Sequence, residues 1–165
     1  MKPLVILGSA RPDGETRRAV EIAFPNNADL VVLSHHHIGG YDYAHSNDGD
    51  EFRLVVEVML KHERLVFATP VYWYAMSAPL KIFFDRLTDL LETAKAGGRA
   101  LQGKTVWVIA TGTEEALPEG FEVPFRSTAA YFAMDYRGSA YLYTGEDAAL
   151  RAASAAALAA FGAAV

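Results

Sequence analysis

The first residues suited to chemistry lie in a short polar loop between an apolar run and a helix. Leu4 to Leu7 has the length of a buried strand, the chain breaks at Gly8, and helical spacing of apolar residues begins near Thr16. The first N–H groups of such a helix have no partners within it and together carry about half a positive charge, so they attract anions. Hydroxyl, guanidinium and glycine groups suit a phosphate here, and the candidates are Ser9, Arg11, Gly14 and Thr16. The plainer alternative is an ordinary first turn with Asp13 as N-cap and Arg11 in solvent.

Two later loops carry aromatic and hydroxyl residues directly after apolar runs. The runs are Arg64 to Thr69 and Lys104 to Ala110. Aromatic side chains such as Tyr72 and Trp73 suit contact with a flat ring, although packing in the core or against a subunit would explain either of them alone. The residues of interest in the two loops are Pro70, Val71, Tyr72, Trp73, Thr111, Gly112 and Thr113.

A long polar loop from Ser34 to Asp50 contains three successive histidines, His35, His36 and His37. Side chains that follow one another on an extended backbone point to opposite sides, so the three rings cannot all reach one ion. We therefore expect a solvated or subunit-contacting loop here and no metal site.

Strands and helices alternate along the chain and determine where these loops lie. Strands are expected at Leu4–Leu7, Leu30–Leu33, Arg64–Thr69, Lys104–Ala110 and Ser139–Tyr143, and helices at Thr16–Ala23, Glu51–Leu60, Ser77–Leu91, Pro124–Met134 and Glu146–Ala164. This order predicts a parallel sheet with helices on both faces, and ligands of such sheets bind beyond the carboxyl ends of the strands. A phosphate cradle and an aromatic loop at that edge suit FMN. Neither a P-loop nor a GxGxxG pattern follows the first strand, which disfavours ATP and a Rossmann-bound dinucleotide.

Composition narrows the class of protein further. A chain of 165 residues with 52% apolar residues predicts one domain, residues 1–165. The net charge of −5 and a pI near 5.5 make nucleic acid an unexpected partner. The absence of cysteine excludes disulfides and thiol nucleophiles. We expect neither a membrane span nor a signal peptide, and a cytoplasmic protein.

Two stretches, GSARPDGETRR and TPVYWYAMSAPLKIFFDRL, closely resemble the flavodoxin-like NAD(P)H-dependent FMN reductases and their multimeric-flavodoxin relatives. The resemblance implies a flavodoxin-like three-layer sandwich, with a five-stranded parallel sheet in the order 2-1-3-4-5. It also implies FMN as cofactor, NADPH or NADH as co-substrate, and a homodimer or homotetramer. The apolar helix from Leu80 to Leu91 favours such an oligomer, because it offers apolar surface on more than one side.

The resemblance also implies roles for individual residues. The phosphate cradle would comprise Ser9, Arg11 and Thr16 with the backbone from Gly14 through Glu15 to Arg17. Pro70, Val71, Tyr72 and Trp73 would lie along the isoalloxazine edge, with Thr111, Gly112 and Thr113 as the second flavin loop. Lys81, Asp85 and Arg86 would have architectural or inter-subunit roles. Two departures from the family are the carboxylate of Glu15, which weakens phosphate binding unless it points away, and the lack of cysteines for an iron–sulfur cluster.

The predicted activity is hydride transfer from NAD(P)H through bound FMN to a quinone, azo, nitro or flavin acceptor. No catalytic side chain is predicted, since N5 of the flavin carries the chemistry. The alternatives are a flavodoxin-like electron carrier with a protein donor, and a flavin-free member of the fold that binds another phosphate ligand. A modest charge of −5 and the apolar Leu80–Leu91 helix favour the oxidoreductase.

Overall fold

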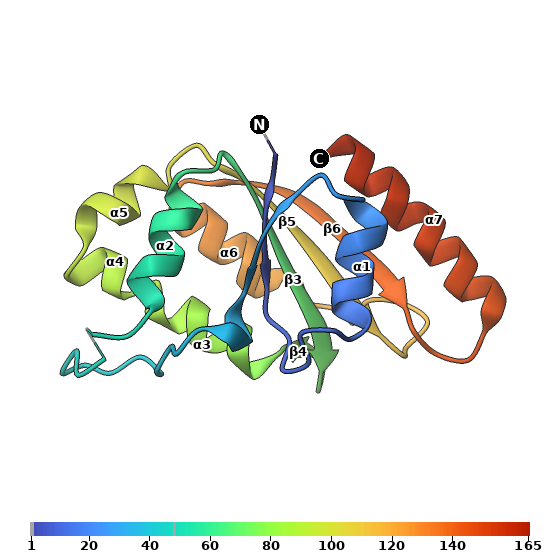
Figure 1. Cartoon of the computed structure of the whole chain (residues 1–165), viewed down its shortest axis with the longest axis horizontal. Coiled ribbons are helices and arrows are strands. Elements are labelled where there is room, and N and C mark those ends of the chain that lie inside the picture. The colour runs from blue at the N-terminus through green and yellow to red at the C-terminus, as the bar shows by residue number, and fades with distance from the viewer. Residues whose placement is uncertain (1, 48) are drawn as a thin grey trace.

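A computed structural model describes residues 2–47 and 49–165, so Asp48 of the polar loop lies outside the described residues, as does Met1. Its central sheet has the order β2-β1-β3-β5-β6, with all of these neighbours parallel (Figure 1). The strands are β1 (Leu4–Leu7), β2 (Asp29–Val32), β3 (Arg64–Tyr72), β5 (Thr105–Gly112) and β6 (Asp135–Tyr143). A short strand, β4 (Ala75–Met76), pairs antiparallel with the end of β3. The predicted order 2-1-3-4-5 is confirmed, with β4 as an addition.

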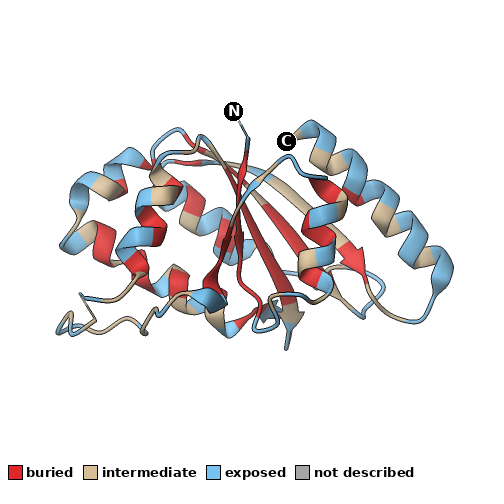
Figure 2. Cartoon of the chain, viewed as in Figure 1, coloured by how far each residue is buried: buried red, intermediate tan, exposed pale blue. Residues whose placement is uncertain are grey.

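Helices cover both faces of this sheet (Figure 1). One face carries α1 (Glu15–Ala23) and α7 (Ala148–Ala164), and the other carries α2 (Phe52–Leu60), α3 (Ala78–Arg86), α4 (Asp89–Glu92), α5 (Lys95–Ala100) and α6 (Val123–Tyr131). Successive side chains of a strand point to opposite faces, so Leu4 and Ile6 join one core while Val5 and Leu7 join the other. Figure 2 shows the resulting buried centre between two helical layers. No helix in the described part of the chain is long and apolar enough to cross a membrane.

The predicted helix from Ser77 to Leu91 is interrupted, because α3 ends at Arg86 and the short α4 begins at Asp89. Leu80, Phe83 and Leu90 are buried within the same chain. The core of this chain therefore covers part of the predicted second apolar side, whereas Ile82 stays partly exposed. A contact of this stretch with a second subunit stays a prediction.

Several other predicted boundaries differ. The strand that begins at Arg64 continues past Thr69 to Tyr72, because β4 supplies hydrogen-bonding partners for its end. The last strand begins at Asp135, earlier than the predicted Ser139. Its register against β5 shifts between Val106 and Trp107, and Gly138, with a φ of 121°, accommodates this irregularity. Leu33 lies in a 3-10 turn, η1 (Leu33–His35), after β2.

The polar loop before α2 is attached to the body of the protein by one buried cation. The Arg86 side chain is 3% exposed and donates from Nε to Asp89 Oδ2 at 2.8 Å and from Nη1 to Asp50 Oδ2 and the Gly39 carbonyl oxygen. Its guanidinium carbon also lies 4.8 Å from the centre of the Phe52 ring. Asp50 Oδ1 in turn accepts a hydrogen bond from the Phe52 N–H at 3.0 Å. Asp50 thereby satisfies the first N–H group of α2, although Glu51 is the residue that directly precedes the helix. Arg86 is thus architectural, as the sequence suggested.

Close contacts fix the β1–α1 loop against the hairpin of β3 and β4. A Cβ atom at Gly8 would lie only 2.5 Å from Leu80 Cβ, so glycine lets α3 approach the backbone there. The buried Ser77 hydroxyl donates to the Gly8 carbonyl oxygen, and the Ser77 N–H donates to Thr69 Oγ1 at 3.0 Å. The base of the hairpin and the loop after β1 therefore form one hydrogen-bonded unit.

Candidate functional site

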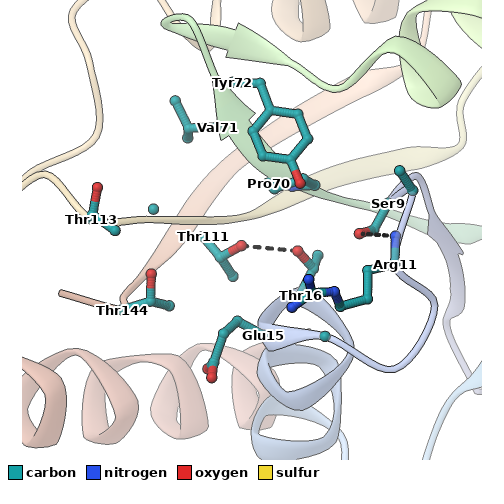
Figure 3. Close-up of a pocket in the computed structure, with 13 residues that line it drawn as sticks. Ser9, Arg11, Glu15, Thr16, Pro70, Val71, Tyr72, Thr111, Thr113 and Thr144 are labelled. Carbon is teal, nitrogen blue, oxygen red and sulfur yellow. Dashed lines mark hydrogen bonds between the residues drawn. The ribbon is translucent and has the colours of Figure 1, made fainter.

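A cavity of ≈ 650 Å³ lies beyond the carboxyl ends of the parallel strands (Figure 3). Three predicted loops meet around it. Its lining residues are Ser9, Ala10, Arg11, Gly14, Glu15, Thr16, Pro70, Val71, Tyr72, Thr111, Gly112, Thr113 and Thr144. Of the residues predicted for the site, Arg17 and Trp73 do not line this cavity.

The start of α1 presents hydrogen-bond donors to one end of the cavity. The helix begins after Gly14, and no described side chain caps its first N–H groups. The alternative with Asp13 as N-cap is therefore wrong. Ser9 and Thr16 are buried beside this helix start, with Ser9 Oγ accepting from the Arg11 N–H at 3.2 Å. Uncapped N–H groups with hydroxyls beside them are suited to an anion such as phosphate.

Arg11 is exposed and has no ion-pair partner among the described residues. Figure 3 shows its side chain running across the start of α1 next to Thr16. A Cβ atom at Gly14 would lie 3.0 Å from Arg11 Cδ, so glycine leaves room for this position. The guanidinium group is therefore available to an anion at the helix start.

The two other charged residues of the cradle point elsewhere. Glu15 Oε2 lies 3.6 Å from Arg18 Nη1, and Figure 3 shows the Glu15 side chain pointing away from Ser9 and Arg11. The Arg17 side chain donates to Glu21 Oε1 at 2.8 Å. The Glu15 carboxylate thus points away from the expected phosphate position, as the sequence analysis required. Because the Arg17 side chain is paired with Glu21, Arg17 can offer an anion at the helix start only its backbone N–H group.

The opposite wall of the cavity is the β3–β4 hairpin. Tyr72 pairs with Ala75, so Trp73 and Tyr74 form a two-residue turn with φ angles of 47° and 64°. Positive φ at both positions matches a type I′ turn, which Asn and Gly ordinarily occupy because bulky residues are strained there. The Trp73 side chain is 92% exposed. Strained and exposed aromatic residues beside a cavity point to a functional role for this turn.

The third wall is formed by the ends of β5 and β6. Thr111 Oγ1 is hydrogen-bonded to Thr16 Oγ1 at 2.9 Å, which joins this wall to α1 (Figure 3). A Cβ atom at Gly112 would lie 2.7 Å from the Tyr141 hydroxyl, so glycine allows that phenol to lie against the backbone. Thr144, whose N–H donates to the Gly112 carbonyl oxygen at 2.8 Å, also lines the cavity but was not predicted. It directly follows the last strand, and the rule that placed the other loops at this edge applies to it as well.

A parallel sheet in this order, with an anion-binding loop after β1 and a cavity at the carboxyl ends of the strands, defines a flavodoxin-like α/β protein. The model of the family described as NADPH-dependent FMN reductase matches residues 1–148. The chain belongs to this family, and the resemblance drawn from its two motifs is confirmed. It is an FMN-dependent NAD(P)H oxidoreductase.

Individual relatives agree with this assignment. The chain is 29% identical over 149 residues to YwqN of Bacillus subtilis, named as an NAD(P)H-dependent FMN-containing oxidoreductase, with 84% of this chain and 82% of the relative covered. The solved structure of the Trp repressor binding protein from Bacillus subtilis superposes with a TM-score of 0.78 at 22% identity, over 97% of this chain and 99% of the other. The general stress protein 14 of Treponema denticola, solved in complex with FMN, gives 0.69 at 22% identity with 99% of both chains covered. At these identities the two structures show the likeness of the fold.

Proposed function

We propose that the ≈ 650 Å³ cavity is the FMN site, with the phosphate at the start of α1 and the ring between the hairpin and the loop after β5. The observation that carries the proposal is the unpaired Arg11 guanidinium beside the uncapped N–H groups of α1, because together they form an anion site at one end of a cavity with an aromatic wall.

Each wall has a distinct task in this proposal. Ser9, Arg11 and Thr16 hold the phosphate with the N–H groups of Gly14 to Arg17. Pro70, Val71 and Tyr72 support one edge of the ring, and the backbone N–H groups from Thr111 to Thr113 stabilise negative charge at the N1/O2 edge. FMN supplies the chemistry by accepting hydride and passing electrons on, so the side chains need only bind and orient.

The overall reaction takes two electrons from the nicotinamide to an acceptor of the quinone, azo, nitro or flavin class. With a quinone, NAD(P)H, one proton and the quinone give NAD(P)⁺ and the hydroquinone, so electrons and protons balance.

We further propose that residues 1–165 form one FMN-binding domain and that the protein works in the cytoplasm as a homodimer or homotetramer.

The test is an anaerobic titration of the FMN-reconstituted protein with NADPH, repeated with NADH, while the flavin absorption bands are recorded. We expect the bands to bleach and to return when a quinone is added. Bound flavin whose bands do not bleach with either nucleotide would contradict the proposal and favour an electron carrier with a protein donor.

A further inference from the structure

A second cavity of ≈ 200 Å³ adjoins the proposed FMN site. The two cavities share Val71, Gly112 and Thr113 as lining residues. The second cavity leads into a third of ≈ 450 Å³, with which it shares Tyr74, Glu114 and Pro118. A molecule in this space would therefore lie next to whatever occupies the site between the hairpin and the loop after β5.

The walls of the second cavity are suited to a flat ring. Trp73 and Tyr74 of the strained turn line it together with Tyr141 and Pro118. The Tyr141 hydroxyl donates to the Glu114 carbonyl oxygen at 2.9 Å, which fixes the position of that ring. Aromatic faces of this kind bind flat apolar molecules by stacking and edge contacts.

The electrostatic character of the second and third cavities is acidic. Glu114 lines both and Glu115 lines the third, and no Lys, Arg or His is among their described lining residues. Neither carboxylate forms an ion pair with a described residue. Burial, followed by the negative charge of Glu114, raises the pKa of the Tyr141 phenol. The Arg11 cation lines the first cavity, at the phosphate end of the proposed site.

We infer that the second cavity is the acceptor subsite and that Glu114 and Glu115 make it select flat aromatic acceptors by charge, with cationic rings favoured over anionic ones such as sulfonated quinones or dyes. The inference rests on the proposed function. It narrows the acceptor class, because a carboxylate at the rim attracts a cationic ring and repels an anionic one.

The test compares the wild type with the double variant Glu114→Gln/Glu115→Gln. The kcat/KM values for a quinone with a quaternary ammonium group and for one with a sulfonate give a preference ratio in each protein. Comparing this ratio between proteins cancels the different reduction potentials of the two quinones. From the Coulomb energy of exposed charges at low ionic strength, we expect the preference for the cation to fall roughly tenfold in the double variant. Glu119→Gln is the control, because it removes one carboxylate from the same loop outside the lining residues, and we expect its ratio to stay within about twofold of the wild type.

A second measurement avoids turnover. N-methylacridinium and acridine-9-carboxylate are flat rings of opposite charge, and their binding to the oxidised FMN-loaded protein can be followed by fluorescence. We expect the wild type to bind the cation more tightly and the double variant to lose most of this preference.

The outcomes separate the two proposals. If the bound flavin bleaches with neither NADPH nor NADH, the proposed function fails, while the binding of the two acridines still tests the charge selection. If quinones are reduced but the double variant keeps the wild-type preference in both measurements, only the charge selection is wrong. An equal loss of preference in Glu119→Gln would also overturn it, because the effect would then come from the overall charge of the protein.

Discussion

Among single residues, Arg11 is the one whose charge the protein itself leaves unsatisfied at the cavity. By contrast, Arg17 is paired with Glu21 and Lys81 with Asp85. An arginine held beside an uncapped helix start has a strong hydrogen-bonding capacity that a phosphate would fill.

We therefore predict that Arg11→Ala weakens FMN binding by about 10- to 100-fold, because hydrogen bonds to charged groups contribute about 1.5–3 kcal/mol. Riboflavin, which lacks the phosphate, should bind both proteins equally well. Arg17→Ala is the matched variant, since this arginine lies on α1 close to the same loop but is paired with Glu21, and the FMN affinity of the variant should change less than about twofold. Dissociation constants from flavin fluorescence titration decide the matter, and equal weakening for riboflavin would remove Arg11 from the phosphate site.

Among the elements, the β3–β4 hairpin departs most from what stability alone would select. Its turn holds Trp73 and Tyr74 at positive φ, where each residue costs roughly 1–2 kcal/mol relative to a residue suited to that conformation. The two rings are exposed, so burial does not offset this cost.

Replacing the turn by Trp73→Asn/Tyr74→Gly relieves the strain at both positions and should thus stabilise the protein by about 2–4 kcal/mol, since Asn-Gly is the preferred type I′ sequence. The same variant should lose acceptor turnover while its FMN affinity changes little, and Trp73→Ala should show the same loss without the gain in stability. Chemical denaturation and steady-state kinetics measure the two effects. A less stable Asn-Gly variant, or one that loses FMN affinity more than turnover, would show that these rings serve packing or cofactor contact.

At the scale of the whole molecule, Arg86 ties the polar loop before α2 to the helices α3 and α4. Burial alone would raise the pKa of the Asp50 carboxyl, but hydrogen bonds from Arg86 and from the Phe52 and Gly39 N–H groups outweigh it and hold that pKa below its usual value. A carboxyl group whose pKa is lowered on folding contributes stability above its unfolded pKa of about 3.9, and this stability is lost as the pH falls through the lower folded value.

Asp50→Asn should accordingly lower the free energy of unfolding at pH 7 by about 1–3 kcal/mol, because Arg86 loses a charged partner. The difference between wild type and variant should shrink as the pH is lowered below about 4. Urea unfolding at a series of pH values gives this difference. Asp85→Asn on α3 breaks only an exposed ion pair with Lys81 and should cost less than about 1 kcal/mol. A difference for Asp50→Asn that does not depend on pH would show that its ionisation has no part in holding the loop.

The position of the site was predictable because it follows from the order of the elements. Apolar spacing alone places the ends of the strands at Leu7, Thr69 and Ala110 on one edge of a parallel sheet. The loops after these strands therefore had to meet, and the structure gathers them around one cavity.

Other features had no local sequence pattern to reveal them. The turn at Trp73 and Tyr74 lacks the glycine or asparagine that marks a type I′ hairpin, so the end of β3 was taken for a loop. The break after Arg86 has neither glycine nor proline. The backbone changes there to i→i−3 hydrogen bonds, from Leu87 to Phe84 and from Thr88 to Asp85, which no local pattern marks. The register shift near Gly138 likewise hid the beginning of β6.

The two hydrogen bonds of Ser77, to Thr69 and to the Gly8 carbonyl oxygen, have a consequence for how enzymes of this shape can diversify. They close the hairpin at its base, so the identity of the two turn residues is uncoupled from the geometry of the phosphate loop. Mutations can then replace the two turn residues while the protein still binds FMN. A directed-evolution library confined to positions 73, 74, 114 and 115 would sample new electron acceptors without spending variants on proteins that no longer hold flavin.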